Sequence, residues 1–339
     1  MAKGLLLIVV VVLAVAAALA YTGGEFSPDR LTPDRFLAQF KAAGVTPGHR
    51  RNHAKGLCFR GDFEANGLGS VLSRATVFTP GRYPVIGRFN LGDPNPQASD
   101  ATVGVRGLGI QITTPDGRQW RSAMINAPVF PVATPQAFYE LLGLPHSTDP
   151  QAMAHFAAAH PEFAAFGALA ARQQHTASYA QEQYNSIDAF LFTNAAGQRH
   201  AVRWAVKAAE PPQPKTPDEL KALGNDFLFN DLRTRQAASP LHFPVVVVVA
   251  APGDPTADPS KAWPADRLQV EVGVLTVREF EAEADGPCRD INYDPTVLPD
   301  GISVSDDPFP AARSAVYARS FDLRTAEEQD YPRTAPVSP

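Results

Sequence analysis

The sequence has very little cysteine, no excess of positive charge and none of the common nucleotide-binding or hydrolase motifs. Its 339 residues include two cysteines, Cys58 and Cys288, too few for a disulfide scaffold or a four-cysteine metal site. Against 30 basic residues stand 35 acidic ones, a net charge of −5, which argues against a nucleic-acid partner. No P-loop, dinucleotide fingerprint, His-Glu-x-x-His or Gly-x-Ser-x-Gly occurs. The cysteine count alone leaves open whether the two cysteines pair with each other.

The composition favours a chain of strands and short helices. Hydrophobic residues make up 45% of the sequence, enough for a sizeable core, and 32 prolines disfavour an all-helical bundle. Apolar runs bounded by Gly, Pro, Asn and Asp predict strands at 70–78, 83–91, 103–113, 120–125, 189–193, 201–206, 244–251 and 268–277. Apolar residues at helical spacing predict helices at 35–43, 135–142, 150–174, 218–235 and 308–323. We therefore expect one α+β domain, with a long bent antiparallel sheet or barrel and helices outside it.

The first 24 residues are predicted to be a signal peptide or an N-terminal membrane anchor, which leaves 25–339 as the folded domain. Lys3 precedes an apolar run over residues 4–20, whose length lies at the lower limit of the ~17–25 residues of a membrane span. Ala18-Leu19-Ala20 has the small residues typical of a cleavage site. Positive charge before the run keeps that end in the cytoplasm. We predict a periplasmic protein, soluble after cleavage or anchored to the inner membrane.

A series of short motifs resembles the haem catalase family in order and spacing. The distal-histidine segment of that family is similar to Asn52-His-Ala-Lys-Gly56, followed by Gly61-Asp-Phe-Glu64. The further motifs are Gly87-Arg-Phe-Asn90, Val105-Arg-Gly-Leu-Gly109, Asn126-Ala-Pro-Val-Phe130, Ala262-Trp-Pro264, Val272-Gly273, Asn292-Tyr-Asp-Pro295, Leu298-Pro-Asp-Gly-Ile302, Arg313-Ser-Ala-Val-Tyr317 and Arg324. The likeness is greatest to the short, exported catalase-related peroxidases. It implies a catalase-like antiparallel β-barrel core with surrounding helices and no C-terminal flavodoxin-like domain.

The resemblance implies roles for the residues that carry the chemistry. His53 would be the distal base, Asn126 the distal amide and Tyr317 the axial ligand of the haem iron. A histidine with a pKa of about 6.5 can take a proton from one peroxide oxygen and deliver it to the other. Asn126 is a neutral donor that can hold a peroxide without competing for its proton. Tyr317 must bind iron as a phenolate, and Arg313 shares its helix face and can stabilise that oxygen.

The implied cofactor is haem b (iron protoporphyrin IX), whose two propionates need positive partners. Arg50, Arg88 and Arg324 match the family positions that serve the propionates, and arginine suits carboxylates through its bidentate geometry. Phe138 matches the ring that flanks the porphyrin face. Arg106 matches a family arginine whose expected role is structural.

Three positions depart from the family pattern. Asn90 stands where catalases carry a small hydroxyl residue that orients the distal histidine, although an amide can also accept from a ring nitrogen. Asn52 replaces an apolar residue, and Gly104 replaces an aspartate of the access channel. We expect a wider channel than in catalases. The prediction is a peroxidase in antioxidant defence that reduces organic peroxides and hydrogen peroxide through a high-valent oxo-iron state, with weak catalase activity.

Two other functions stay open at this point. One is rearrangement of lipid hydroperoxides by an enzyme resembling allene oxide synthase, and the other is a non-enzymatic haem or lipid carrier. The expected partners are a peroxide and a small-molecule electron donor, and the sequence predicts no oligomeric state. Replacing His53 with alanine separates carrier from enzyme, because a carrier is indifferent to this side chain.

Overall fold

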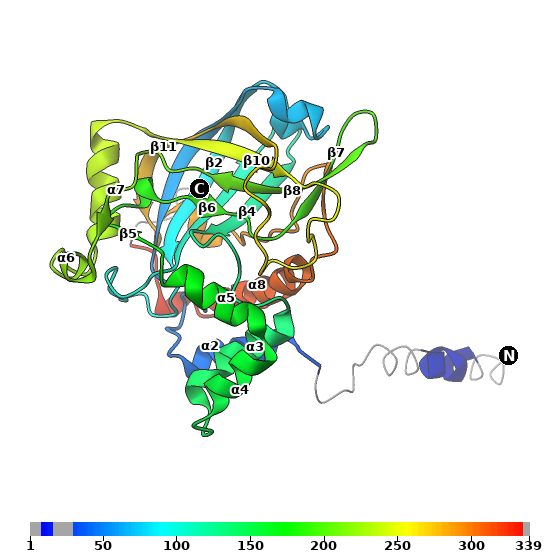
Figure 1. Ribbon diagram of the computed structural model, residues 1–339, viewed down its shortest axis with the longest axis vertical. Coiled ribbons are helices and arrows are strands. Elements are labelled where there is room, and N and C mark those ends of the chain that lie inside the picture. The colour runs from blue at the N-terminus through cyan, green and yellow to red at the C-terminus, as the bar shows by residue number, and fades with distance from the viewer. Residues whose placement is uncertain (1–7, 16–29, 335–339) are drawn as a thin grey trace.

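The computed structural model describes residues 8–15 and 30–334, and its centre is a closed antiparallel barrel (Figure 1). The strands follow the order β10-β11-β1-β2-β3-β4-β6-β8, and β10 pairs with β8 to close the ring. Their bounds are β1 Gly56–Ala65, β2 Gly81–Leu91, β3 Arg106–Thr113, β4 Gln119–Ile125, β6 Tyr184–Asn185, β8 Arg199–Val206, β10 Leu241–Val249 and β11 Gln269–Ala282. Two further strands, β7 (Phe190–Thr193) and β12 (Ile302–Val304), extend the sheet beyond β8. The predicted α+β fold with an antiparallel barrel is confirmed.

Alternation along the strands gives the barrel two different faces. In β4, Trp120, Ser122 and Met124 are buried, whereas Ala123 and Ile125 on the other face are only half-buried. Successive side chains of a strand point to opposite faces, so one face of β4 fills the barrel and the other can meet the helices outside. The indole of Trp120 packs at 5.1 Å from that of Trp204 and at 5.4 Å from the ring of Phe78. Aromatic rings therefore fill the barrel, which leaves no pore.

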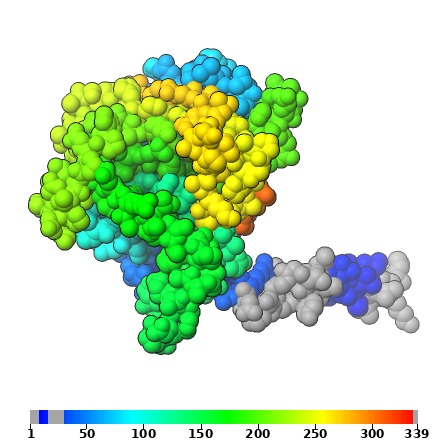
Figure 2. Space-filling view, viewed as in Figure 1, coloured from blue at the N-terminus to red at the C-terminus, as the bar shows by residue number. Residues whose placement is uncertain are grey.

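The helices gather mostly outside one side of the barrel (Figure 1), at α2 Pro33–Ala42, α3 Pro135–Gly143, α4 Ala152–Ala159, α5 Pro161–Ala170, α6 Pro217–Lys221, α7 Phe227–Ala238 and α8 Phe309–Ala326. The first turns of α2 and α3 follow from the sequence, since Thr32 and Thr134 cap them and a proline occupies the next position of each. The α2 helix packs against α3 and α8. Residues 135–170 form a lobe that projects from the barrel (Figure 2). A wall of helices thus faces the outer surface of the strands.

The structure corrects several boundaries. The strand expected at 70–78 is wrong: this segment forms two 3-10 turns, in which the Ser70 and Ser73 hydroxyls bond to nearby backbone groups instead of leaving them to a ladder. The helix expected at 150–174 breaks before Pro161, and the one expected at 218–235 is divided into α6 and α7. Strand β1 was not predicted at all. The remaining expected helices and strands are confirmed to within a few residues.

Two features concern the cysteines and the N-terminus. Cys58 in β1 and Cys288 form a disulfide between buried residues 230 positions apart, which answers the question of pairing. Of the apolar run at 4–20, the structure describes residues 8–15, which are helical, and the rest lies outside the described residues. Across the described parts of the chain, no helix has both the length and the apolar character that crossing a bilayer requires. The signal-peptide or anchor hypothesis stays a prediction.

Candidate active site

A cavity of about 480 Å³ lies between strands β2 to β4 and helices α2, α3, α5 and α8. This volume is typical of cofactor and ligand sites. Of the eight residues expected to carry the chemistry, seven line it: Arg50, His53, Arg88, Phe138, Arg313, Tyr317 and Arg324. These residues come from segments as far apart as 50 and 324, so the fold brings together what the sequence separates. The eighth, Asn126, lies next to it.

His53 is held in one tautomer by Asn90. The imidazole Nδ1 lies 2.6 Å from Asn90 Oδ1, and the Asn90 amide nitrogen in turn donates to the backbone oxygen of Arg88 at 3.4 Å. Since Asn90 presents an acceptor, Nδ1 carries the hydrogen and Nε2 keeps a free lone pair. Burial, together with the charges of Arg88 and Arg313, lowers the pKa of His53 to about 4 despite the bond to Asn90. At neutral pH the ring is therefore an uncharged base.

The backbone at His53 is strained in a way that marks the site. Its φ of 56° lies in the left-handed region, which a non-glycine residue adopts at a cost. The Asn52 side chain accepts from the His53 backbone N–H at 2.9 Å and helps to hold this conformation. This local geometry comes directly before β1, and it aims the ring at the cavity rather than along the strand.

Tyr317 and Arg313 lie one turn apart on α8, as their spacing predicts. Arg313 donates through Nε and Nη2 to the Tyr317 hydroxyl oxygen at 3.3 and 3.2 Å. Nη2 also donates to the Ala123 backbone oxygen at 2.7 Å, and Nη1 donates to Asp188. Burial opposes the charge of Arg313, but Tyr317 and Asp188 raise its pKa above the ordinary value. A permanently charged guanidinium thus donates two hydrogen bonds to the phenol oxygen.

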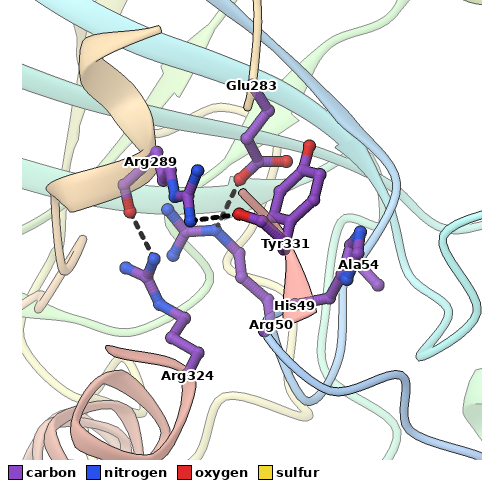
Figure 3. A pocket seen from close by; sticks show the side chains of 8 residues that line it. His49, Arg50, Ala54, Glu283, Arg289, Arg324 and Tyr331 are labelled. Atoms are coloured by element: carbon purple, nitrogen blue, oxygen red, sulfur yellow. Dashed lines mark hydrogen bonds and ion pairs between the residues drawn. The ribbon is translucent and has the colours of Figure 1, made fainter. Parts of the chain in front are cut away.

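Three arginines surround one carboxylate at the edge of the cavity. Glu283 binds Arg88 at 2.6 and 2.8 Å and Arg50 at 3.2 Å, while Arg324 donates to the backbone oxygen of Arg289. Figure 3 shows Arg50 extending between Arg324 and Glu283, beside a small hollow that shares both arginines with the main cavity. Among these four side chains, three positive charges face one negative charge, an excess of +2, and Arg289 beside them is paired with Glu328 at 3.7 Å.

This excess charge is visible in the pKa values of the group. Burial alone would raise the pKa of Glu283, but Arg88 and Arg50 lower it to about 2. Burial lowers the pKa of Arg324 to about 9, and repulsion from Arg50 adds to the effect. Buried charges are stable only when paired. The cluster is therefore suited to an additional ligand with two negative charges.

Asn126 is not brought into the cavity. Its side-chain oxygen accepts from the Arg106 backbone N–H at 3.0 Å, and its amide nitrogen donates to the Gly104 oxygen and to Glu182, both at 3.2 Å. The cavity lining includes the neighbouring Ile125 and Ala127 but not Asn126. Arg106 and Glu182 form a buried ion pair behind it. These contacts give Asn126 and Arg106 a structural place beside the site.

Much of the remaining cavity wall is apolar. Phe138 lines it and packs against Phe130, with the ring centres 4.9 Å apart. Helices α2 and α5 add Phe36, Phe40 and Phe163. A flat hydrophobic ligand with charged groups on one edge would match a cavity that combines arginines with aromatic rings.

A tyrosine on an outer helix and a half-buried histidine thus share one cavity beside a closed barrel, and comparisons with known proteins identify the family. Residues 36–330 match the catalase family. A catalase-related peroxidase of Synechococcus elongatus is 38% identical over 307 residues, which covers 88% of this chain and 91% of that protein. A catalase-related peroxidase of Mycolicibacterium paratuberculosis is 32% identical over 303 residues and covers 88% and 96%. The chain belongs to the catalase family, and it is an oxidoreductase as predicted.

Solved catalases show the same fold at low sequence identity. A bacterial catalase superposes with a TM-score of 0.71 at 21% identity and covers 89% of this chain. Catalase A from Saccharomyces cerevisiae gives 0.72 at 19% identity and covers 85%. This chain spans 62% and 63% of the lengths of those two proteins.

Two residues of the site carry no signal in the sequence. Glu283 lies in the acidic run Glu281-Ala-Glu-Ala-Asp285, where nothing distinguishes it from its exposed neighbours. Asp188 follows Ser186-Ile187 in a short loop that resembles any turn. Both become recognisable only when the fold places them against arginines from distant segments.

Proposed function

We propose that this protein is a haem b peroxidase that reduces organic peroxides, and hydrogen peroxide, at the expense of a small-molecule electron donor, with weak catalase activity, in antioxidant defence. The observation that carries the proposal is the single cavity lined by His53, Tyr317 and the three arginines around Glu283. Each of these groups answers a separate requirement of the chemistry.

The residues of the cavity fit haem b. The net charge of +2 around Glu283 matches two propionates, and the aromatic wall suits a porphyrin face. Arg50, Arg88 and Arg324 would hold the propionates, Phe138 would flank the ring and Tyr317 would bind the iron. Both cysteines are used in the disulfide, so none is available for a thioether link to the cofactor. Bound haem would supply the redox chemistry, taking up the oxidising equivalents of the peroxide and passing them to the donor.

The protein side chains manage the proton. His53 is neutral with Nε2 free, so it can accept the proton of a hydroperoxide and return it to the leaving oxygen, which departs as an alcohol or water. Asn90 keeps the ring in this tautomer during both transfers. Arg313 donates two hydrogen bonds to the oxygen of Tyr317, the proposed iron ligand. Asn126, the residue expected to be the distal amide, stays a prediction; it lies beside the cavity, where its amide donates to Gly104 and Glu182.

The apolar helices support organic peroxides as substrates. Helices α2 and α5 add hydrophobic surface to the cavity through four phenylalanines, Phe36, Phe40, Phe163 and Phe166. Burial of an alkyl chain against such a wall favours binding by about 25 cal/mol per Å² of apolar surface. Hydrogen peroxide has no apolar surface to bury. We therefore expect kcat/KM to be higher for alkyl hydroperoxides than for hydrogen peroxide.

The test is to purify the haem-loaded protein and compare two reactions. With an alkyl hydroperoxide and a phenolic donor we expect donor oxidation and the corresponding alcohol, and with hydrogen peroxide alone we expect slow release of oxygen. Fast oxygen release with little donor oxidation would refute the proposed preference. An epoxide or ketol product from a fatty acid hydroperoxide would instead establish the rearrangement activity.

We also propose that the folded domain is exported to the periplasm. Lys3 and the apolar run at 4–20 support export, and a buried disulfide is typical of proteins that fold in an oxidising compartment. Fractionation of cells with antibody detection tests this, and recovery of the protein from the cytoplasm would contradict it.

A further inference from the structure

Helices α4 and α5 present a surface with almost no charged residues. Among residues 152–170, Glu162 is the only Asp, Glu, Lys or Arg, and His155 is the only fully exposed polar residue. Met153 is 51% exposed and Leu169 is 43% exposed. The other exposed residues are small or apolar: Ala154, Ala158, Ala159, Pro161, Ala164, Ala165, Gly167, Ala168 and Ala170. We call the exposed residues of 152–170 the lobe face, which projects from the barrel in Figure 2.

Helix α5 separates the lobe face from the cavity. Phe163 and Phe166 of this helix line the cavity, whereas Leu169 and the alanines of the same helix are exposed. Phe163 also packs edge-on against Phe156 of α4, with the ring centres 5.3 Å apart. A helix with its side chains is about 10–12 Å across. An apolar molecule on the lobe face therefore lies about one helix diameter from the cavity.

The N-terminal sequence indicates what covers the lobe face. Residues 4–20 contain only apolar side chains and glycine, and the large ones within the described residues 8–15 are all exposed. The twelve residues 21–32 link this run to Pro33, where α2 begins. At about 3.6 Å per residue such a link spans at most about 43 Å.

The link enters the folded domain beside the lobe. Helix α2 packs against α3, and the ring of Phe36 lies 5.6 Å from that of Tyr139. Figure 1 shows α2, α3 and α4 side by side at the same end of the molecule. A bilayer that takes up residues 4–20 therefore keeps the lobe close to its surface, which raises the effective concentration of the lobe there.

The opposite end of the molecule offers a matched surface without these features. The 3-10 turn η1 (Leu68–Val71) has Leu68 at 56% and Val71 at 65% exposed, values similar to those of the lobe face. It lies across the barrel from α2 and α4 (Figure 1), and neither of these residues lines the cavity. Exposed apolar side chains alone therefore do not distinguish the lobe face, whereas its place beside α2 and the cavity does.

We propose that the lobe face lies on the surface of the bilayer that residues 4–20 enter, and that the cavity takes hydroperoxides of membrane lipids. The proposal rests on the proposed function, because it takes the cavity as the site of hydroperoxide reduction, and it names the class of organic peroxide. Helices satisfy their own backbone groups, so α4 and α5 can approach hydrocarbon without leaving polar groups unpaired. The oxidised acyl chain enters past Phe163 and Phe166. It leaves as the corresponding alcohol.

The experiment measures kcat/KM of the full-length, haem-loaded protein with a phenolic donor and two substrates. One is phosphatidylcholine hydroperoxide in phosphatidylethanolamine–phosphatidylglycerol vesicles, and the other is tert-butyl hydroperoxide in solution. Met153→Glu/Leu169→Glu should lower the value for the vesicle substrate about tenfold or more, because two carboxylates oppose contact with lipid, and should leave the soluble substrate unaffected. The control variant Leu68→Glu/Val71→Glu should leave both values unchanged. An unaffected vesicle rate in the lobe variant, or an equal loss in the control, would overturn the proposal.

A second measurement reads contact with lipid without activity. With vesicles of brominated phosphatidylcholine, the added fluorescence of Leu169→Trp should be quenched and that of Val71→Trp should not, relative to the wild type with its three tryptophans. Equal quenching, or none in Leu169→Trp, would overturn the proposal, and this result decides if the charged lobe variant does not fold. So would an oligomer that the lobe variant dissociates while its vesicle rate is unaffected, because a second copy would then cover the lobe face. A wild type that reduces neither hydroperoxide would contradict the proposed function, whereas the quenching would still report docking.

Discussion

Replacing Glu283 with glutamine should destabilise the haem-free protein and tighten its hold on haem. The pKa of Glu283 is lowered from 4.5 to about 2, which at 1.36 kcal/mol per pKa unit corresponds to about 3 kcal/mol of stability. Because the pKa in the folded state is the lower one, this stability is present above about pH 4.5 and is lost as the pH falls through about 2. Removing one partner of a buried ion pair typically costs about 3–5 kcal/mol. We expect a loss of that size from the haem-free variant at pH 7.

The haem-loaded variant should lose less stability. Without Glu283 the three arginines carry a net charge of +3, and two propionates compensate more of it than they do in the wild type. If haem recovers about 1–2 kcal/mol of the loss, its Kd falls roughly five- to thirtyfold, since tenfold corresponds to about 1.4 kcal/mol. Urea unfolding of both forms and haem titration measure the two sides of this relation.

Glu182→Gln is the matched control. Glu182 and Glu283 are both 8% exposed, and each pairs with an arginine that is at most 2% exposed. The Arg106–Glu182 pair does not line the cavity, so its loss should lower the stability of both forms equally and leave the haem Kd unchanged. Weaker or unchanged haem binding by Glu283→Gln, beside an unaffected control, would refute the role of the arginine cluster in holding propionates.

Four further outcomes are expected. His53→Ala should keep haem but react with peroxide about 10²–10⁴-fold more slowly in stopped-flow measurements, and an unaffected rate would contradict its role as the base. In the wild type that rate should be constant between about pH 6 and 8 and fall as Nε2 is protonated near pH 4, and a midpoint near 6.5 would show that burial does not lower the pKa. Asn90→Leu should slow the reaction about tenfold by freeing the other tautomer, with recovery in Asn90→Ser, which keeps an acceptor. The Cys58→Ser/Cys288→Ser variant should lose about 2–4 kcal/mol of stability in urea unfolding; a loss within error of zero would mean that the cross-link does not constrain the unfolded chain.

The barrel strands could be predicted from the sequence where a few consecutive residues carry the hydrophobic pattern of a strand. The consecutive valines of β10 and the alternation in β4 identify both elements without tertiary information. Strand β1 escaped prediction because its ten residues include Arg60, Gly61 and Asp62, and only pairing with β2 and β11 on both sides makes them extended. The prediction of a strand at 70–78 is wrong for the opposite reason. The serines of this segment form local hydrogen bonds, which β-propensity does not take into account.

Most residues of the site could be predicted from motifs, but not all of them. His53, Arg313 and Tyr317 stand in recognisable strings, and the fold places all three in the cavity. Asn126 stands in a string of the same kind, yet its amide is occupied by Gly104 and Glu182, which only the packing of a distant loop determines. Asp188 depends on a γ-turn at an isoleucine, a conformation that the residue type disfavours and that no sequence rule anticipates.

The cavity is walled by two kinds of structure, the strands of a closed barrel on one side and separate short helices on the other. The proton-handling histidine, its asparagine and Arg88 belong to the barrel and the segment before it, and Arg313 and Arg324 belong to α8, whereas α3 and α5 contribute only hydrophobic side chains to the cavity. Substitutions on those two helices can therefore reshape the entrance for a new substrate while the reactive groups keep their places. Related proteins could therefore accept different substrates while they keep the same reactive groups.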